Sequence, residues 1–239
     1  MNKTRLDKLL VIRGLAKTRS KAEDLVRRGF VSVDQMVVTK PGIFLDNNSK
    51  LLVDAHESFV SRAGEKLNSV VDLFKLDFAN KVVLDVGSST GGFSELSLRR
   101  GANKVIAVEL GTDQMHPRLR EDSRIELHEK TDIRDFKTNE HIDIVVIDVS
   151  FISLREILPS ISRLSADDTT VVAMVKPQFE AVTGGLKHKG VIKNDNMRRA
   201  ILKDFENWCR TSFVIKAKAD SAVAGAKGNV ERFYLLNRK

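Results

Sequence analysis

The segment KVVLDVGSSTGGFSE, residues 81–95, brings together residue types that can bind a ligand. An apolar run ends at Asp85, a loop of small residues follows, and a helical pattern begins near Gly92. Glycines let the backbone approach a ligand closely, and doubly wound sheets bind ligands at the carboxyl ends of their strands. The spacing Gly-x-x-x-Gly-Gly matches neither the Walker motif nor the dinucleotide fingerprint. We therefore expect a ligand at this loop.

A second acid, Glu109, ends the next apolar run, in the segment AVELG. An acid at that place can accept hydrogen bonds from both ribose hydroxyls of an adenosine. The glycine loop between two such acids suggests an adenosine without pyrophosphate, for which S-adenosylmethionine is the natural candidate. Two alternatives stay open at this point: a fold that binds NAD, and a nucleotide fold that has lost its ligand.

Four more polar side chains are expected at the same edge of the sheet. Asp148 and Lys176 each follow an apolar run. Lys66 lies in a helix that enters the sheet domain, and Glu231 opens the last strand. The Asn/Asp-Pro-Pro-aromatic pattern of amino-group methyltransferases is absent after Asp148, where the sequence continues Val-Ser-Phe. The pattern therefore favours an acceptor other than an amino group.

Lysines beside carboxylates suit a hydroxyl acceptor. A neutral ribose 2′-OH is a poor nucleophile, so it helps to hold the oxygen in line with the methyl carbon and to remove its proton. A lysine can take that proton when burial or a second lysine disfavours its own charge. The alternative for each lysine taken singly is a solvated or ion-paired surface residue. Lys176 is the exception, because it directly follows a buried apolar run.

The order of apolar runs and helical patterns along the chain predicts the elements that position these groups. From residue 61 onward, short runs rich in Val and Ile alternate with helical stretches, which indicates a parallel sheet covered on both faces. Two closing runs, SFVIKAKADS and ERFYLLNRK, are expected to pair antiparallel. Residues 1–53 instead predict two short helices and a small hairpin. We expect domains at 1–53 and 61–239, joined by a linker at 54–60.

Positive charge is concentrated in the first segment. The 239-residue chain carries a net charge of +8, of which residues 1–53 supply +6. A basic segment on a near-neutral body suggests nucleic-acid binding, although solvated helix faces explain the charge equally well. Lysines in the Gly- and Lys-rich loop near residue 188 can meet phosphates as a lid, or have no role. The candidate nucleic-acid contacts are Arg5, Lys8, Arg19, Lys21, Arg27, Arg28, Lys187 and Lys189.

Several classes of protein are disfavoured. The single cysteine, Cys209, excludes an intramolecular disulfide and fits a reducing, cytoplasmic location. The amino terminus lacks a signal-peptide core, no apolar run approaches the roughly 20 residues of a membrane span, and the histidines lack metal-ligand spacing. Trp208 and Cys209 read as core. Phe151 is compatible with stacking on a target base or with core packing.

Five motifs carry a resemblance: SRAGEKL, DVGSSTGGFSE, VIDVSFISL, VKPQFE and GNVERF. They resemble the TlyA, or haemolysin A, family of ribosomal RNA 2′-O-methyltransferases, whose sheet domain is similar to the FtsJ/RrmJ class. The segment RLDKLLVIRGLAKTRSKAEDLVRRGFVSV resembles the RNA-binding domain of ribosomal small-subunit protein four. The match covers nearly the whole chain in the family's order. It implies an α/β fold with a Rossmann-like, seven-stranded methyltransferase sheet and a small amino-terminal α+β RNA-binding domain.

The resemblance also implies roles for residues. It assigns a Lys-Asp-Lys-Glu catalytic tetrad to Lys66, Asp148, Lys176 and Glu231. Asp132 would face the adenine amino group, and Glu109 stands where aspartate is commoner. The implied S-adenosylmethionine contacts are Asp85, Gly87, Ser88, Ser89, Thr90, Gly91, Gly92, Phe93, Glu109, Asp132, Ile133 and Asp148.

The substrate implied by the resemblance is a cytidine in ribosomal RNA, in the large subunit and sometimes also the small one. Ribosomal RNA or ribosomal subunits would be the partners, with no metal, no membrane and no obligate protein partner evident. Two rival functions remain. A pore-forming haemolysin would make liposomes leak, and a catalytically inactive ribosome-assembly factor would fail to bind S-adenosylmethionine.

Overall fold

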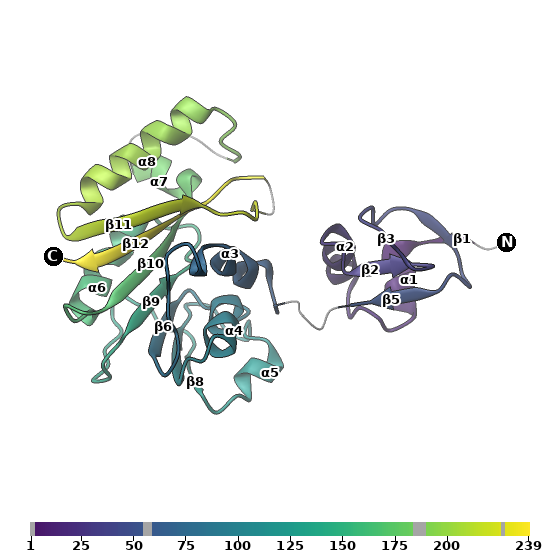
Figure 1. The fold of residues 1–239 in the computed structure, drawn as a ribbon, viewed down its shortest axis with the longest axis horizontal. Coiled ribbons are helices and arrows are strands. Elements are labelled where there is room, and N and C mark those ends of the chain that lie inside the picture. The colour runs from purple at the N-terminus through teal and green to yellow at the C-terminus, as the bar shows by residue number, and fades with distance from the viewer. Residues whose placement is uncertain (1–2, 55–58, 184–189, 226–227) are drawn as a thin grey trace. The chain divides into compact units, whose positions relative to one another are not determined.

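The computed structural model describes residues 3–54, 59–183, 190–225 and 228–239. The chain forms two compact units, Met1–Ser58 and Phe59–Lys239 (Figure 1). Two of the lysines expected to meet nucleic acid, Lys187 and Lys189, lie outside the described residues. Each unit has a hydrophobic core of its own, so each is considered by itself.

Unit 1 packs two helices against short antiparallel strands. The predicted helices and the hairpin around residue 34 are present, and three further strands, β1, β4 and β5, were not expected. β2 pairs with β3 and β5, and β1 pairs with β4. Three-residue strands are too short to show an alternating pattern, which explains why the sequence missed them. The elements are β1 Lys3–Arg5, α1 Leu6–Ile12, α2 Arg19–Arg27, β2 Val31–Val33, β3 Met36–Val37, β4 Phe44–Asp46 and β5 Leu51–Val53.

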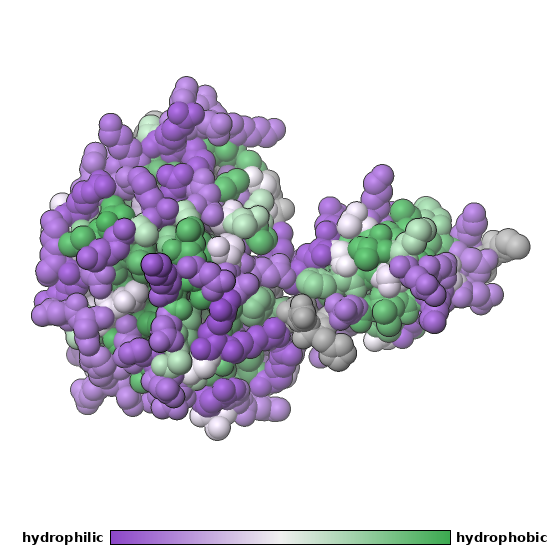
Figure 2. Space-filling view, in the orientation of Figure 1, coloured by the Kyte–Doolittle hydropathy of each residue, from purple (hydrophilic) through white to green (hydrophobic). Residues whose placement is uncertain are grey.

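Apolar side chains reach the surface of unit 1 as well as its core. Leu10, Leu25 and Val31 are buried together between the helices and β2. Met36 and Leu52, by contrast, are 72% and 62% exposed. Figure 2 shows apolar residues among the hydrophilic ones on the visible face of this unit. Its core is small, so its stability depends on polar anchors as well.

Asp7 is such an anchor, a fully buried carboxylate in α1. Arg5 donates to it from Nε and Nη2 at 3.1 and 2.7 Å, and Arg19 Nε donates at 3.0 Å. The backbone N–H of Lys8 also donates to it, at 2.8 Å. The Arg5 hydrogen bonds hold the pKa of Asp7 well below its usual range. Two arginines expected to contact nucleic acid are therefore fixed from inside the unit.

Unit 2 is a seven-stranded sheet with helices on both faces. The strand order is β11-β12-β10-β9-β6-β7-β8. Strands β6 to β10 run parallel, and β12 lies antiparallel to both β10 and β11. This confirms the predicted parallel sheet with a closing antiparallel pair. The elements are α3 Arg62–Val71, β6 Val82–Val86, α4 Gly92–Arg99, β7 Lys104–Val108, α5 Pro117–Arg120, β8 Ile125–His128, β9 Ile144–Ile147, α6 Leu154–Leu164, β10 Thr170–Val175, α7 Pro177–Thr183, α8 Asp195–Cys209, β11 Phe213–Asp220 and β12 Arg232–Arg238.

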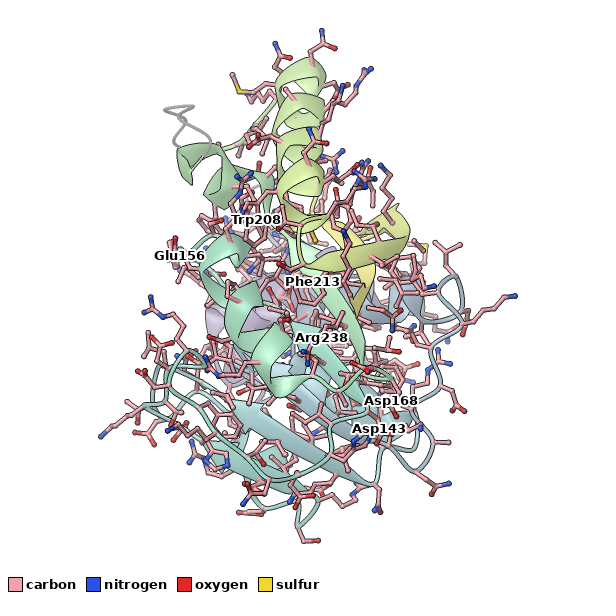
Figure 3. All side chains as sticks on the ribbon, turned by 90° about the vertical axis from the view of Figure 1, so that its left-hand side faces the viewer. Asp143, Glu156, Asp168, Trp208, Phe213 and Arg238 are labelled. Carbon is pink, nitrogen blue, oxygen red and sulfur yellow. The ribbon has the colours of Figure 1, made fainter. Side chains whose placement is uncertain are left out.

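Two cores explain why the strands are continuous apolar runs. On one face α6 and α8 bury residues such as Leu158 and Phe205 against the sheet, and on the other face α3 and α4 bury residues such as Leu67 and Phe93. Figure 3, turned so that α6 faces the viewer, shows Trp208 of α8 near Glu156 in the first turn of α6. With both faces covered, polar side chains can emerge only at the strand ends.

The strand order reverses at β6. The chain runs outward from β6 through β7 to β8 and then returns to β9 on the other side. Asp85 lies in β6, while Glu109, Asp148 and Lys176 directly follow β7, β9 and β10. The side chains singled out in the sequence therefore gather at the topological switch point, where sheets of this class bind ligands.

The shared carboxylate of unit 1 gives a first prediction. Asp7→Ala leaves Arg5 and Arg19 without their buried partner and removes several charge-assisted hydrogen bonds, so we expect it to lower the free energy of unfolding of unit 1 by about 2 kcal/mol or more at pH 7. Because the carboxyl pKa is depressed by folding, this contribution is present above the ordinary pKa of about 4 and is lost as the pH falls below it. Hydrogen exchange in peptides from residues 4–49 measures the effect.

Glu23→Ala is the matched control. Glu23 also pairs with Arg19, at 3.5 Å, but its side chain is 33% exposed. It should cost well below 1 kcal/mol. Equal protection of unit 1 in the two variants at pH 7, or a difference that persists unchanged at pH 3, would contradict the assignment.

Candidate active site

Two adjoining cavities open at the switch point. The larger, of about 730 Å³, lies over the ends of β6, β7 and β9, and the smaller, of about 230 Å³, lies between the start of α3 and the glycine loop. Gly87, Ser89 and Asp148 line both. The larger volume is in the usual range for small-ligand sites.

The glycines of the loop are required by close packing. Gly87 has φ +79°, and a Cβ there would lie 2.9 Å from the carbonyl oxygen of Asp148. Gly91, the N-cap of α4, has φ +89°, and a Cβ there would lie 2.5 Å from Leu119. Other residues would be strained in this conformation and would also clash. The loop is therefore held against the end of β9, close to the acid that follows that strand.

Asp85 is fully buried at the base of the smaller cavity. Ser94 Oγ donates to its Oδ2 at 2.6 Å, while Oδ1 has no hydrogen-bond partner in the part of the chain that the structure describes. Burial raises the pKa of Asp85 to about 7, opposed by the bond from Ser94. Ser88 Oγ is likewise buried without a partner among those residues. Buried polar atoms are normally satisfied, so these two fit a polar ligand group in the cavity.

Glu109 is already tied to the glycine loop. Its Oε2 accepts from the Ser89 N–H at 2.9 Å, and its Oε1 accepts from the Gly111 N–H at 2.7 Å. Gln114, which the sequence did not single out, accepts from Ser89 Oγ at 3.0 Å and lines the larger cavity. Glutamate is one methylene longer than aspartate, which lets this carboxylate reach the backbone N–H groups of both Ser89, in the glycine loop, and Gly111, after β7.

Asp132 and Ile133 line the larger cavity beyond β8. The Asp132 carboxylate accepts from Arg134 Nε and Nη2 at 3.0 and 2.6 Å, and this pairing lowers its pKa. Arg134 was not singled out in the sequence, because a salt bridge between residues two positions apart leaves no periodic pattern. Ile133 is 5% exposed and packs in the core behind the cavity wall.

The four tetrad candidates form two neighbouring ion pairs, and one residue of each pair, Lys66 and Asp148, lines the smaller cavity. Lys66 Nζ in α3 lies 2.9 Å from Glu231 Oε1, and Lys176 Nζ lies 2.6 Å from Asp148 Oδ1. All four side chains are at least four-fifths buried. Burial raises the pKa of Asp148, while the charges of Lys176 and Lys66 oppose that shift. One carboxylate therefore senses both amines.

Two further contacts hold this cluster. Lys176 Nζ also donates to Ser150 Oγ at 2.6 Å, so a neutral hydroxyl helps to orient the amine. Beside Glu231, a Cβ on Gly225 would lie 2.5 Å from Oε1, and the Gly225 N–H donates to the Asn229 carbonyl at 2.8 Å. The sequence did not single out these three residues, because no spacing rule links them to the tetrad.

Phe151 lies on the rim of the larger cavity. Its side chain is 90% exposed and its φ is +66°, which is unusual for an aromatic residue. Its ring packs against Phe179 with centroids 5.2 Å apart. Core packing is thus excluded for Phe151. Trp208 packs against the core that contains Cys209, and burial raises the pKa of Cys209 to about 12, so a packing role is correct for both.

The basic candidates of unit 1 differ in their surroundings. Besides Arg5 and Arg19 on Asp7, Arg27 lies 3.7 Å from Glu23. Arg28 pairs with Asp24 at 3.0 Å and stacks over Phe30, with its side chain only 9% exposed. Lys8 is exposed, and Lys21 is half-buried. Lys8 and the arginines at 5, 19 and 27 thus offer more charge to solvent than Arg28 does.

The described part of the chain contains neither a candidate metal site nor a candidate membrane span. Among the residues that the structure describes, no three His, Cys, Asp or Glu side chains are placed to hold a metal ion. Within the same ranges, no helix is long and apolar enough to cross a membrane.

Comparison with known proteins adds a family to this geometry. The model of the FtsJ-like methyltransferases matches residues 59–238, and that of the S4 domain matches residues 4–49. The chain is 35% identical to the 16S/23S rRNA (cytidine-2′-O)-methyltransferase TlyA of Mycobacterium tuberculosis, covering 98% of this chain and 90% of that protein. It is 41% identical to the 23S rRNA (cytidine-2′-O)-methyltransferase TlyA of Campylobacter jejuni, over 74% and 70% of the two chains.

A solved structure agrees over the full length. The chain is similar to the “Putative hemolysin from Streptococcus thermophilus”, with a TM-score of 0.75, 33% identity, and coverage of 100% of this chain and 90% of that one. The chain therefore belongs to the family of FtsJ-like methyltransferases that includes TlyA.

Proposed function

We propose that this protein transfers a methyl group from S-adenosylmethionine to the 2′-OH of a cytidine in ribosomal RNA. The observation that carries the proposal is the meeting of two lysine–carboxylate pairs beside a cavity at the switch point. The names of the two TlyA relatives support the substrate, since both are called rRNA (cytidine-2′-O)-methyltransferases. Ribosomal RNA as the partner implies a cytoplasmic location.

The residues at the cavities fit the cofactor. Asp85 and Ser88 offer unsatisfied buried oxygens to an amino acid moiety. Glu109, which follows β7 and lines the larger cavity, is expected to accept hydrogen bonds from the ribose hydroxyls, and Ile133 and Asp132 line the wall expected to face adenine. When bound, S-adenosylmethionine supplies a methyl group on a sulfonium, which is electrophilic without further activation.

The protein's own residues then act on the acceptor. The proposed step requires the neutral amine of Lys176, which has two N–H groups and one lone pair. Asp148 and Ser150 can accept the two N–H groups, which leaves the lone pair for the ribose hydroxyl. In the proposal this lone pair takes the hydroxyl proton as the oxygen bonds to the methyl carbon and the bond from that carbon to sulfur breaks. Lys66, which Glu231 holds in place, adds positive charge beside the ribose oxygen as that oxygen loses its proton.

The target nucleotide needs a surface and an anchor. Bases in single-stranded RNA stack on exposed aromatic rings, and the 90% exposed ring of Phe151 on the cavity rim suits such a contact. Unit 1 supplies a net +6 charge over residues 1–53 for phosphate contacts. In this proposal, unit 1 binds the RNA and unit 2 transfers the methyl group.

The lysine assignment predicts a separation of binding from chemistry. Lys176→Ala should abolish methyl transfer, a loss of at least about a thousandfold, because the proton acceptor is gone. S-adenosylmethionine affinity should change by less than about threefold, since the amine is not needed to hold the cofactor. Calorimetry measures the affinity, and transfer of labelled methyl to rRNA measures the rate. Lys203→Ala, an exposed lysine on α8, is the control; wild-type turnover in Lys176→Ala would reject the assignment.

The raised pKa of Asp85 predicts pH-dependent cofactor binding. The ammonium group of S-adenosylmethionine would favour the ionised form of the Asp85 carboxylate. Cofactor binding must therefore displace the proton that Asp85 carries below its pKa of about 7. The dissociation constant should therefore rise more than about tenfold as the pH falls from 7.5 to 5.5. Calorimetry in two buffers of different ionisation enthalpy detects the released proton. Asp85→Asn should bind more weakly with no such dependence, and a flat wild-type profile would exclude this role.

Unit 1 predicts the salt dependence of RNA binding. Deleting residues 1–53 should weaken binding to rRNA and flatten the dependence of affinity on salt, because fewer counterions are released. Filter binding between 50 and 300 mM salt measures the slope. Unchanged S-adenosylmethionine affinity would show that unit 2, which has its own cores, is intact. A slope equal to that of the full chain would place the RNA contacts elsewhere.

A further inference from the structure

The rim of the site, residues 149–153, holds a strained conformation. It connects Asp148, at the end of β9, to α6, and it presents Phe151. A left-handed φ of +66° is an unfavourable backbone conformation for an aromatic residue. Such a conformation persists only where surrounding contacts fix it. One short segment, Lys176 and helix α7, supplies side-chain contacts at both ends of this rim, while Val149 and Ile152 pack against the core.

The first end of the rim is held by the proposed catalytic lysine. Lys176 Nζ lies 2.6 Å from Asp148 Oδ1 and donates to Ser150 Oγ at 2.6 Å. Phe179, one turn further along, packs its ring against Phe151. The segment that follows β10 thereby contacts the loop after β9 through the proposed catalytic lysine.

The second end is held by a buried acid that lines neither cavity, Glu180. Its Oε2 accepts from Ser153 Oγ at 2.6 Å, and its Oε1 accepts from the Leu154 N–H at 2.7 Å. Glu180 is 2% exposed, and burial raises its pKa while the bond from Ser153 opposes the shift. Arg155 Nε, 3.7 Å away, adds a positive charge. The carboxylate thus caps α6 where the rim ends.

Lys176 directly precedes α7, and Glu180 lies within that helix, four residues further on. Side chains at i and i+4 lie on one face of a helix, about one turn apart. One turn of α7 therefore spans the rim from Ser150 to Ser153, with one charged group at each end. The two ends of the rim thus contact residues that lie about one helical turn apart in the same short segment.

We propose that Glu180 is a positioning residue for methyl transfer, which clamps the rim segment 149–153 and so sets the placement of Asp148 and Phe151 relative to Lys176. This inference rests on the proposed function for its kinetic consequence. Its structural part, the clamp itself, can be measured without any substrate.

The test compares Glu180 with a matched buried acid. Glu206 on α8 is 7% exposed and accepts from Lys218 Nζ at 2.8 Å and from Tyr234 Oη at 2.9 Å, but it touches neither the rim nor the cavities. Single-turnover methyl transfer to rRNA at saturating cofactor should fall at least tenfold in Glu180→Ala, with the S-adenosylmethionine dissociation constant within twofold of wild type. Glu206→Ala should keep the rate within twofold.

The conservative variant supplies a rescue. In Glu180→Gln the amide oxygen can still accept from the Leu154 N–H, and the amide nitrogen can donate to Ser153 Oγ. Its rate should lie within about threefold of wild type, although its charge is lost. If Glu180→Ala does not fold, Glu180→Asp takes its place. Its shorter side chain cannot reach both partners, so its rate should fall at least fivefold.

The outcomes are separable from the fate of the proposed function. Hydrogen exchange in peptides covering residues 149–154 should be faster in Glu180→Ala and unchanged in Glu206→Ala, whether or not rRNA is the substrate. If wild-type protein methylates no rRNA, the proposed function fails and exchange alone decides the clamp. Unchanged exchange and rate at residue 180, equal rate losses at 180 and 206, or no rescue by glutamine would each overturn the inference.

Discussion

A parallel sheet buried on both faces leaves one place for polar chemistry, the ends of its strands. In unit 2 the helices α3, α4, α6 and α8 cover both faces, so the side chains along β6, β7, β9 and β10 are almost all apolar. The reversal of strand order at β6 then opens a gap between neighbouring loops. The glycine loop, both cavities and the ion pairs all depend on that gap.

Burial of charge imposes the second constraint. An isolated ammonium or carboxylate is costly to remove from water, so lysines at the bottom of a cavity need partners. Here each amine has its own acid, with Lys66 on Glu231 and Lys176 on Asp148. The pairing keeps both lysines inside the site and still leaves positions on each amine unused. The four side chains carry no net charge together, so they can stay buried before any nucleotide binds.

The sequence predicted most of the fold because its signals are local. Short runs rich in Val and Ile, each followed by an acid, a lysine or a glycine loop, identify buried strands and their functional ends. What it missed depends on contacts between distant segments. Ser150 beside Lys176, Gly225 beside Glu231 and Gln114 beside Ser89 come together only through strand order. In unit 1, the burial of Asp7 beneath two arginines has no periodic signature either.

The position of β12 bears on how the site is assembled. β12 lies between β10 and β11, both of which precede it in the chain, and Glu231 comes directly before it. Its bond to Lys66 joins residues 165 positions apart. Closing a loop of this length costs conformational entropy. Lys66 gains the Glu231 carboxylate only once β12 has paired between β10 and β11, so the complete set of ion pairs requires the whole sheet.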